Sequence, residues 1–280
     1  MSTPSVTSLP DASRVEQRMR HAPVERGLGM VPAPGEGFRL RAPLHDGVRD
    51  DDGLVAPALV ALLADSGIGF LIYTAGELTA GAPTVELRID HLGPSAADAT
   101  EVRAEFTLLH IDEQVGVGRA DIRDDTGRPV AHAVATMALT GVPDRPGALG
   151  GDSAPDDAED FRAGRPAFDA ARLDPATLEF DGDLAVLVPG RSATNLNGTT
   201  HGAVLAALAK AAQIRFLARD GAGARSLSDT VDYLRPVSTD TRVRARCETV
   251  RSGRRFWTVR TELLLPDDRV AVRATGNGIR

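Results

Sequence analysis

The sequence is nearly free of cysteine, since Cys247 is the only one in 280 residues. A single cysteine excludes an internal disulfide framework and is typical of proteins in a reducing compartment. The first 23 residues contain no apolar stretch of the kind found in secretory signals. We therefore expect a cytoplasmic protein.

An excess of positive charge is missing as well. Lys and Arg number 32 against 39 Asp and Glu, which gives a net charge of -7. Generic nucleic-acid binding needs a basic face, so we expect no nucleic-acid partner. A local arginine cluster could still bind a small anionic ligand, because local and global charge are independent.

The sequence also lacks an uninterrupted membrane span. Residues 53–75 are long and apolar, but Asp65 lies in their middle. A charge at the centre of a bilayer costs roughly 2.5–3.5 kcal/mol on insertion scales. We expect this stretch to be a buried core helix and the protein to have no membrane partner.

Several catalytic and metal-binding signatures are absent. The other histidines show no metal-ligand spacing, and there is no Gly-x-Ser-x-Gly elbow or phosphate-binding loop. We therefore predict neither a metal nor a resident cofactor.

What the chain does contain is a repeat. Ala56 and His201, like Asp65 and Lys210, are 145 positions apart, whereas Pro94 and Pro236 are 142 apart. A near-constant offset indicates two copies of one unit. Each copy reads as one long apolar helix followed by strands of alternating polarity, an α+β unit with a roughly five-stranded antiparallel sheet. The helix is too apolar to be covered by anything except its sheet.

The repeat fixes the expected domain organisation. We predict a flexible arm with one short helix at Ala12–His21, two equivalent domains, and a Pro-, Gly- and Asp-rich linker. The boundaries are 1–35 for the arm, 36–143 for the first domain, 144–165 for the linker and 166–280 for the second domain.

The second copy carries the most distinctive motif. Asn195, Gly198, His201 and Gly202 precede an apolar run from Val204 to Leu217. This pattern places a His-Gly pair at the N-terminus of a buried helix. The unpaired N–H groups there are suited to hold a negative or polarised oxygen.

These residues resemble the hotdog-fold acyl-CoA thioesterases of the PaaI-like family, whose motif reads Asn-x-x-Gly-x-x-His-Gly-Gly. In that family an acid lies on the helix nine residues after the His, and a Ser or Thr lies on the next strand. The first copy supplies Asp65 and Thr84 at those two positions, while Ala203 replaces the second Gly of the motif. The resemblance implies a tandem, double hotdog that acts as a thioesterase.

Each copy lacks what the other keeps. In the first copy Asp50, Ala56 and Pro57 replace the Asn, His and Gly, and in the second copy Lys210 replaces the acid, with Ser226 at the hydroxyl position. The family builds each site across a pair of hotdogs. The resemblance therefore implies one complete composite site per chain and one incomplete pseudo-symmetric site.

The complete site would combine residues from both copies. The resemblance implies that Asp65 is the base or the nucleophile, that Thr84 orients Asp65 or the attacking water, and that the Gly202 N–H binds the oxyanion. Asn195 and His201 would position the thioester and the water. Coenzyme A, present only as part of the substrate, brings phosphates that arginines can bind. The candidates are Arg235, Arg251, Arg254 and Arg255.

Other functions remain open at this point. The chain could be a non-catalytic acyl-CoA or fatty-acyl binding module, a hotdog hydratase or dehydratase, or a structural assembly protein. Leu196 and Gly198 stand where the hydratases carry Asp and Asn, which counts against that class. The acyl group and its carrier, CoA or acyl carrier protein, are not determined by the sequence. We expect a homodimer, as is common for this fold.

Overall fold

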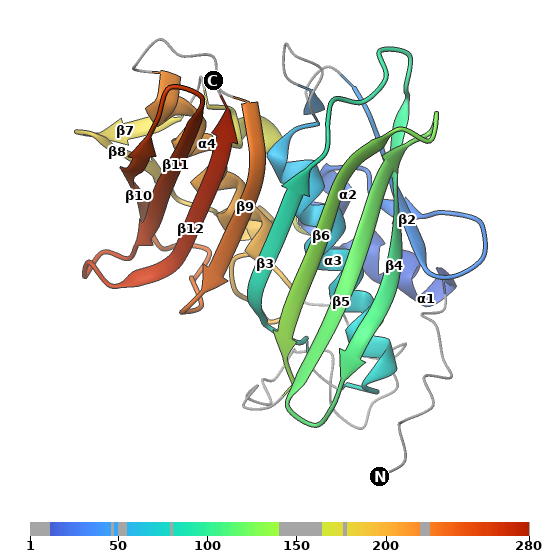
Figure 1. Ribbon diagram of the computed structural model, residues 1–280. Helices are drawn as coiled ribbons and strands as arrows, with labels where there is room; N and C mark the ends of the chain where they lie inside the picture. Colours follow the sequence, from blue (N-terminus) through green and yellow to red (C-terminus); the bar gives the residue numbers. More distant parts are fainter. Residues whose placement is uncertain are drawn as a thin grey trace.

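The computed structural model describes residues 12–45, 48–49, 55–78, 81–139, 164–175, 178–218 and 225–279. Most of the predicted linker and Asp50 lie outside the described residues. The described chain forms two similar halves that share one sheet (Figure 1).

The first half wraps a sheet around a long helix, α3 (Pro57–Ala75). Pro57 occupies the first turn, where its missing N–H costs nothing. The strands are β2 (Arg39–Pro43), β3 (Thr84–His91), β4 (Glu101–Ile111), β5 (Val115–Asp124) and β6 (Pro129–Ala138).

The second half repeats these elements around α4 (Gly202–Ala218). Its strands are β8 (Leu184–Leu187), β9 (Arg225–Tyr233), β10 (Val243–Ser252), β11 (Phe256–Leu264) and β12 (Val270–Ile279). Each half also has a short outer strand, β1 (Val31–Pro32) and β7 (Glu179–Asp181), and two 3-10 helices, η2 (Ala170–Leu173) and η3 (Arg191–Ala193), flank β7 and β8.

The sheet order shows how the halves join. The twelve strands run β1-β2-β4-β5-β6-β3-β9-β12-β11-β10-β8-β7, so the second half mirrors the order of the first. The junction is the antiparallel pair β3–β9, which lies in the middle of the molecule (Figure 1). The predicted double hotdog is confirmed, with six strands rather than five in each half because of the short outer strands.

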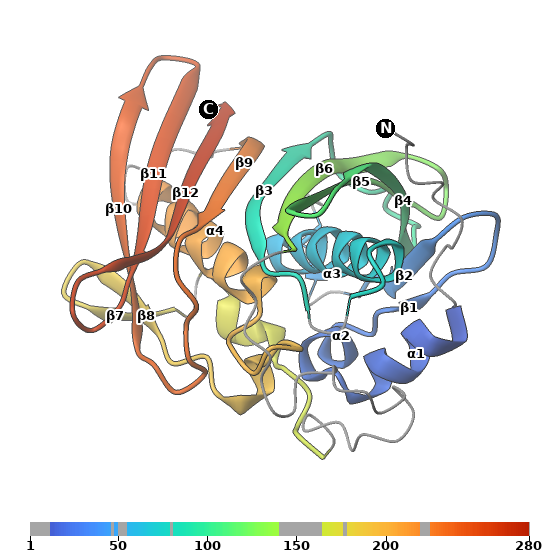
Figure 2. The same ribbon diagram turned by 90° about the horizontal axis from the view of Figure 1, so that it is seen from below.

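Both helices lie on the same, concave side of the sheet (Figure 2). Leu59, Leu62 and Leu63 of α3 are fully buried, and α3 also packs against α4. The helix is long and apolar enough to cross a membrane, yet 78% of its apolar window is buried inside the protein. This burial confirms the prediction of a core helix.

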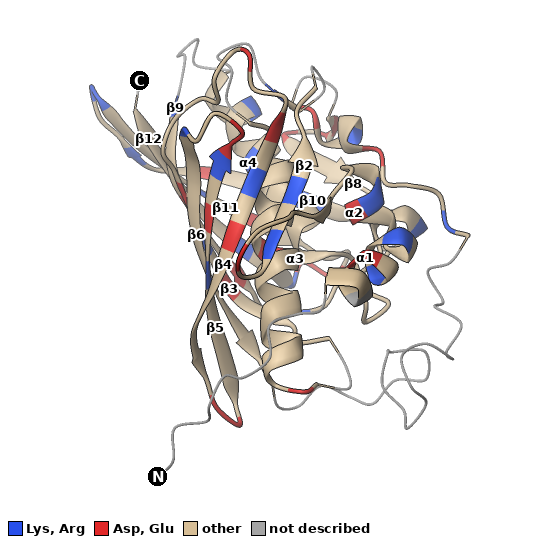
Figure 3. Cartoon of the chain, turned by 90° about the vertical axis from the view of Figure 1, so that its right-hand side faces the viewer, with Lys and Arg blue, Asp and Glu red and all other residues tan. Residues whose placement is uncertain are grey.

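The outer face of the sheet is charged. Lys and Arg alternate with Asp and Glu along the strands (Figure 3). Several of these side chains pair across neighbouring strands, such as Arg41 with Glu101 at 2.8 Å and Arg246 with Glu262 at 2.7 Å. Cross-strand pairs of this kind support the register of a sheet with one solvated face.

The N-terminal segment differs from the flexible arm that we expected. The predicted helix is present as α1 (Ala12–His21), and a second short helix, α2 (Pro23–Gly27), follows it. Val15, Met19 and Val24 are buried in the same core as α3. Residues 12–30 are thus a packed layer below α3 (Figure 2) rather than a loose arm, because their apolar side chains cover one side of the helix that the sheet leaves open.

Candidate functional site

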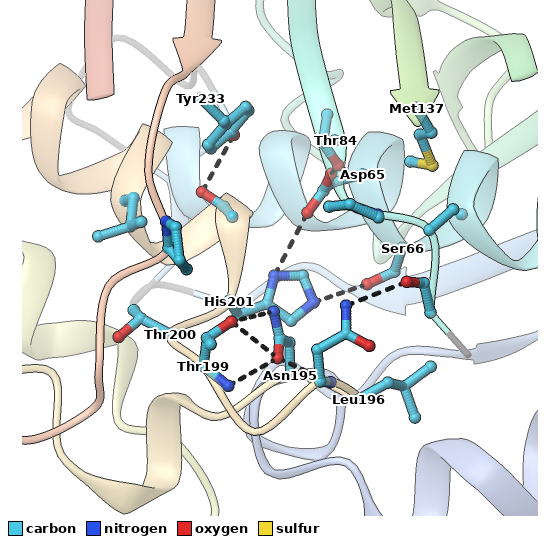
Figure 4. A pocket seen from close by; sticks show the side chains of 18 of the residues that line it. Asp65, Ser66, Thr84, Met137, Asn195, Leu196, Thr199, Thr200, His201 and Tyr233 are labelled. Carbon is cyan, nitrogen blue, oxygen red and sulfur yellow. Dashed lines mark hydrogen bonds and ion pairs between the residues drawn. The ribbon is translucent and has the colours of Figure 1, made fainter. Parts of the chain in front are cut away.

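A cavity of about 400 Å³ lies where the two halves meet. One wall is formed by α2, α3, the start of β3 and the end of β6. The opposite wall is formed by the loop before α4, by α4 itself and by the end of β9. All five predicted catalytic residues line it: Asp65, Thr84, Asn195, His201 and Gly202. In Figure 4 the labelled side chains of Thr84, Asp65 and His201 point toward one another, and Asn195 bonds to Thr199 beside them.

Asp65 lies on α3 and is only 6% exposed. Its Oδ1 accepts a hydrogen bond of 2.6 Å from the hydroxyl of Thr84, and its Oδ2 lies 3.4 Å from Nδ1 of His201 (Figure 4). The carboxylate therefore bridges the two halves of the chain, between a hydroxyl of its own half and the imidazole of the other.

Thr84 reaches Asp65 because β3 is irregular at its start. Leu87 and Ile89 are buried under the sheet, so a regular alternation would place Val85 inside and Thr84 outside. A β-bulge between Thr84 and Glu86 reverses this, and Val85 is 45% exposed instead. Bulges commonly redirect a side chain next to a functional site.

His201 precedes α4 and is buried. Its Nδ1 accepts a hydrogen bond of 3.1 Å from the N–H of Ala203, so the imidazole caps the helix N-terminus. On its other side Nε2 lies 3.2 Å from the hydroxyl oxygen of Ser66 and 3.5 Å from a carboxylate oxygen of Glu25. The ring thus contacts α2, α3 and α4. His201 caps the helix and also lines the cavity.

Gly202 is the first residue of α4. A Cβ at this position would lie 3.0 Å from Oδ2 of Asp65 and 3.3 Å from the ring of Tyr233. Glycine therefore allows the carboxylate to approach the helix end closely. Among the described residues none accepts a hydrogen bond from the Gly202 N–H, which leaves that donor available to a ligand.

Asn195 has a local task. Its Oδ1 accepts hydrogen bonds from the backbone N–H groups of Asn197 and Thr199, and its Nδ2 donates to the Thr199 hydroxyl (Figure 4). The next asparagine, Asn197, donates to the carbonyl of Gly81 at 3.1 Å. The bonds of Asn195 shape the loop before α4, and the bond of Asn197 ties that loop to the first half of the chain. Asn195 thus lines the cavity, and its side-chain amide is used within the loop.

Glu25, Ser66 and Tyr233 are among the lining residues that were not predicted from the sequence. Ser66 directly follows Asp65, and its polarity on an apolar helix was a usable signal. The position of Tyr233, at the end of β9, depends on the strand pairing. Glu25 lies in the segment expected to be loose, where nothing in the local pattern marks it.

Tyr233 acts as a fixed donor. Its hydroxyl donates a hydrogen bond of 3.1 Å to the carbonyl of Gly202. Burial, and secondly the nearby carboxylate of Asp65, raise the pKa of this phenol well above its ordinary value. The proton therefore stays on the hydroxyl and holds the first turn of α4 in place.

The four predicted arginines are not together. Arg235 lies at the exposed rim of the cavity, next to Pro236. Arg251, Arg254 and Arg255 lie at the β10–β11 turn, which aligns through β12 with the start of β9 rather than with its end. The eight-residue step along β9 corresponds to roughly 26 Å. The prediction that these three residues belong with the site is wrong, because strand direction places their turn at the opposite end of the sheet.

The pseudo-symmetric position is filled by an ion-paired cluster. Nζ of Lys210 lies 2.8 Å from Oδ1 of Asp229, and Nε2 of His91 lies 2.7 Å from Oδ2 of the same residue. Burial would raise the pKa of Asp229, but Lys210 and then His91 outweigh it and lower the pKa. Lys210 is thus buried and pairs with Asp229 of β9, a residue of its own half.

Metal ligands do not gather here. In the part of the chain that the structure describes, no group of three or more His, Cys, Asp or Glu side chains is arranged to hold a metal ion. The chemistry available in the cavity is that of two carboxylates, an imidazole, several hydroxyls and a helix N-terminus.

Comparison with known families decides the class of the second half. Residues 191–277 match the family described as the acyl-CoA thioesterase N-terminal domain. The second half is similar to a thioesterase domain. The match confirms the prediction that the protein is a thioesterase, and it includes Asn195, His201 and Gly202 but neither Asp65 nor Thr84. No match to a curated protein is found.

Solved structures resemble the whole chain. The tesB protein of Mycobacterium avium subsp. paratuberculosis is 10% identical, with 95% of this chain and 99% of that chain covered and a TM-score of 0.58. The acyl-CoA thioesterase II TesB2 of Mycobacterium marinum is 13% identical, with 91% and 96% covered and a TM-score of 0.54. The 12:0-ACP thioesterase of Umbellularia californica is 12% identical, with 87% and 93% covered and a TM-score of 0.55. The likeness at these identities concerns the fold, which is that of the hotdog thioesterases.

Proposed function

We propose that this thioesterase hydrolyses an acyl-CoA thioester at one composite site per chain, formed by Asp65 and Thr84 of the first half and His201 and Gly202 of the second. The observation that carries the proposal is the meeting of a buried carboxylate with a free helix N–H across the junction, where Asp65 lies against the position of a Cβ on Gly202. Thioester hydrolysis needs both a base or nucleophile and an oxyanion donor.

The reaction can be written with these groups. In one route, Asp65 takes a proton from water while the water oxygen attacks the thioester carbonyl. In the other, the carboxylate itself attacks, and water then hydrolyses the mixed anhydride. In both routes the carbonyl oxygen becomes negative and accepts a hydrogen bond from the Gly202 N–H. The C–S bond then breaks, and the thiolate leaves and is protonated. Thr84, at 2.6 Å, orients the carboxylate for either route.

One site per chain follows from the contents of the other position. There the position equivalent to Asp65 is occupied by Lys210, which is already paired with Asp229. Ala56, at the position of His201, has no imidazole, and Pro57, at the position of Gly202, has no N–H to donate. A thioester bound at this second position would face the Lys210–Asp229 ion pair where the first position has the carboxylate of Asp65.

The cavity also offers side chains suited to the two ends of such a substrate. Phe70, Met137 and Leu205 supply apolar wall for an acyl group. Arg235 at the rim is the arginine of the predicted set that remains a candidate for the phosphates of CoA. The PaaI-like subgroup, the homodimer and the cytoplasmic location remain predictions.

The decisive experiment is a thiol-release assay over short, long and aromatic acyl-CoAs. Asp65→Asn keeps the side-chain size and is expected to lower kcat by at least about 100-fold, because general-base catalysis contributes on the order of 10²–10⁴-fold. The matched control is Ser226→Ala on β9, at the position equivalent to Thr84, which should keep wild-type rates. Equal loss in both variants, or full activity of Asp65→Asn, would contradict the proposal. Acyl-CoA binding without thiol release by the wild type would indicate a binding module instead.

A further inference from the structure

The segment before the first hotdog half contributes a buried carboxylate to the cavity. Glu25, on α2, is only 5% exposed and lines the cavity beside Ser66. The hydroxyl of Ser66 donates a hydrogen bond of 3.1 Å to Oε1 of Glu25, and the same hydroxyl oxygen lies 3.2 Å from Nε2 of His201. Three residues from three elements thus form a continuous chain of polar contacts.

The chain of contacts has one consistent direction. A serine hydroxyl has one proton, and here it points to Glu25, so the Ser66 oxygen can only accept from His201. Nε2 of His201 therefore carries a proton. Nδ1 is then free to accept the N–H of Ala203, which is the bond found at 3.1 Å. The opposite tautomer would turn an Nδ1 proton toward Oδ2 of Asp65 at 3.4 Å, but it would set that proton against the Ala203 N–H and leave Nε2 facing Ser66 without one.

We propose that Glu25, acting through Ser66, is a positioning residue that fixes the orientation and the Nε2–H tautomer of His201. The imidazole in turn caps α4 and so sets where the Gly202 N–H lies relative to Asp65. The segment at residues 12–30 is on this basis part of the functional unit and not only a cover for α3. The expected changes in kcat rest on the proposed function. The expected tautomer and orientation of His201 do not.

The first test reads the imidazole directly. Long-range 1H–15N spectra report the tautomer of each of the six histidines, and the His201 signals are assigned by their loss in His201→Asn. The wild type should show the Nε2–H form. Ser66→Ala removes the link with little change in volume and is expected to shift His201 away from that form, while His132, which contacts Asp121 elsewhere, stays unchanged. An unchanged His201 spectrum in Ser66→Ala would overturn the proposal.

The second test separates positioning from simple support of α2. Glu25→Met keeps the length but has no acceptor, and Glu25→Gln keeps an acceptor oxygen for the Ser66 hydroxyl. Glu25→Met and Ser66→Ala are each expected to lower kcat by about 10- to 100-fold with little change in KM, by analogy with the groups that orient metal-binding imidazoles. Glu25→Gln should recover most of the rate.

The double variant Glu25→Met/Ser66→Ala should be no worse than either single variant, because both break the same contact chain. Additive losses, or a Glu25→Gln as poor as Glu25→Met, would overturn the proposal. If Asp65→Asn turns out to be fully active while the His201 spectra respond as stated, the proposed function fails and the positioning of His201 by Glu25 stands.

Discussion

Arg88 of β3 and Thr230 of β9 face each other across the junction, and they are also equivalent positions of the repeat, 142 residues apart. A residue pair that maps onto itself when the halves are exchanged marks a local two-fold axis between the two strands. The axis places the Asp65–His201 cluster at one end of the β3–β9 pair and the Lys210–Asp229 cluster at the other. The same sheet frame therefore presents two positions, which differ in their side chains and in the backbone N–H that Pro57 lacks and Gly202 has.

Thr84→Val tests the hydrogen bond between Thr84 and Asp65, which the β-bulge in β3 makes possible. The change removes the hydroxyl that donates to Asp65 at 2.6 Å and keeps the branched shape. We expect kcat to fall by about 10-fold, since a hydrogen bond to a charged group is worth about 1.5–3 kcal/mol. In an Asp65→Asn background the same change should have little further effect. An equal loss in both backgrounds, measured by thiol release, would show that Thr84 acts independently of Asp65.

Two glycines on α3 provide a matched pair. A Cβ at Gly67 would lie 2.0 Å from the ring of Phe106, whereas a Cβ at Gly69 would first meet the tip of Met137, at 3.5 Å. We expect Gly69→Ala to be stabilising by up to about 1 kcal/mol through helix propensity. Gly67→Ala should be destabilising by about 1–3 kcal/mol through overpacking. Denaturant unfolding of both variants measures the difference, and equal stabilities would contradict the packing of α3.

Gly69 also lines the cavity, so the same substitution has a functional consequence. An added methyl group narrows the apolar wall, and Gly69→Leu narrows it further. The ratio of kcat/KM for the longest to the shortest accepted acyl-CoA should fall in the order wild type, alanine, leucine. A constant ratio would mean that the acyl group does not lie along α3.

Asp229→Asn tests the cluster at the pseudo-symmetric end. The variant leaves Lys210 buried without its carboxylate, which should lower the free energy of unfolding by about 3–5 kcal/mol near neutral pH. The folded-state pKa of Asp229 lies below its ordinary value of 3.8, so its contribution is complete above that pH and is lost as the pH falls through the folded pKa. The gap between wild type and variant should therefore shrink as the pH falls below 3.8. A gap that widens below that pH would contradict the pairing.

Tyr233→Phe removes the donor to the Gly202 carbonyl and leaves the ring in place. We expect a loss of about 1 kcal/mol in unfolding free energy, the typical net worth of a buried hydrogen bond. Because the folded-state pKa lies well above the ordinary value of 10.0, the contribution of the phenol is complete below that pH and falls as the pH rises above 10.0, where the unfolded chain ionises first. Denaturant unfolding on both sides of pH 10.0 measures the difference between wild type and variant. A difference that stays constant above pH 10.0 would show that the phenol ionises equally in the folded and unfolded chain.

The sequence by itself determined the elements and the repeat. Alternation along the strands and the apolar runs from Pro57 and from Gly202 are local patterns, because burial on one face or on all faces is written into successive residues. The pairing of Asp65 with His201 was also accessible, since the two copies lack complementary parts.

Only the tertiary structure decided which side chains meet across elements. The bulge before Glu86 turned Thr84 inward, strand direction moved Arg251 to the far end of the sheet, and packing of α2 brought Glu25 to His201. The packing of α4 against the sheet likewise decided that Lys210 pairs with Asp229 of β9. Such contacts depend on register and on the path of distant segments, which no local pattern encodes.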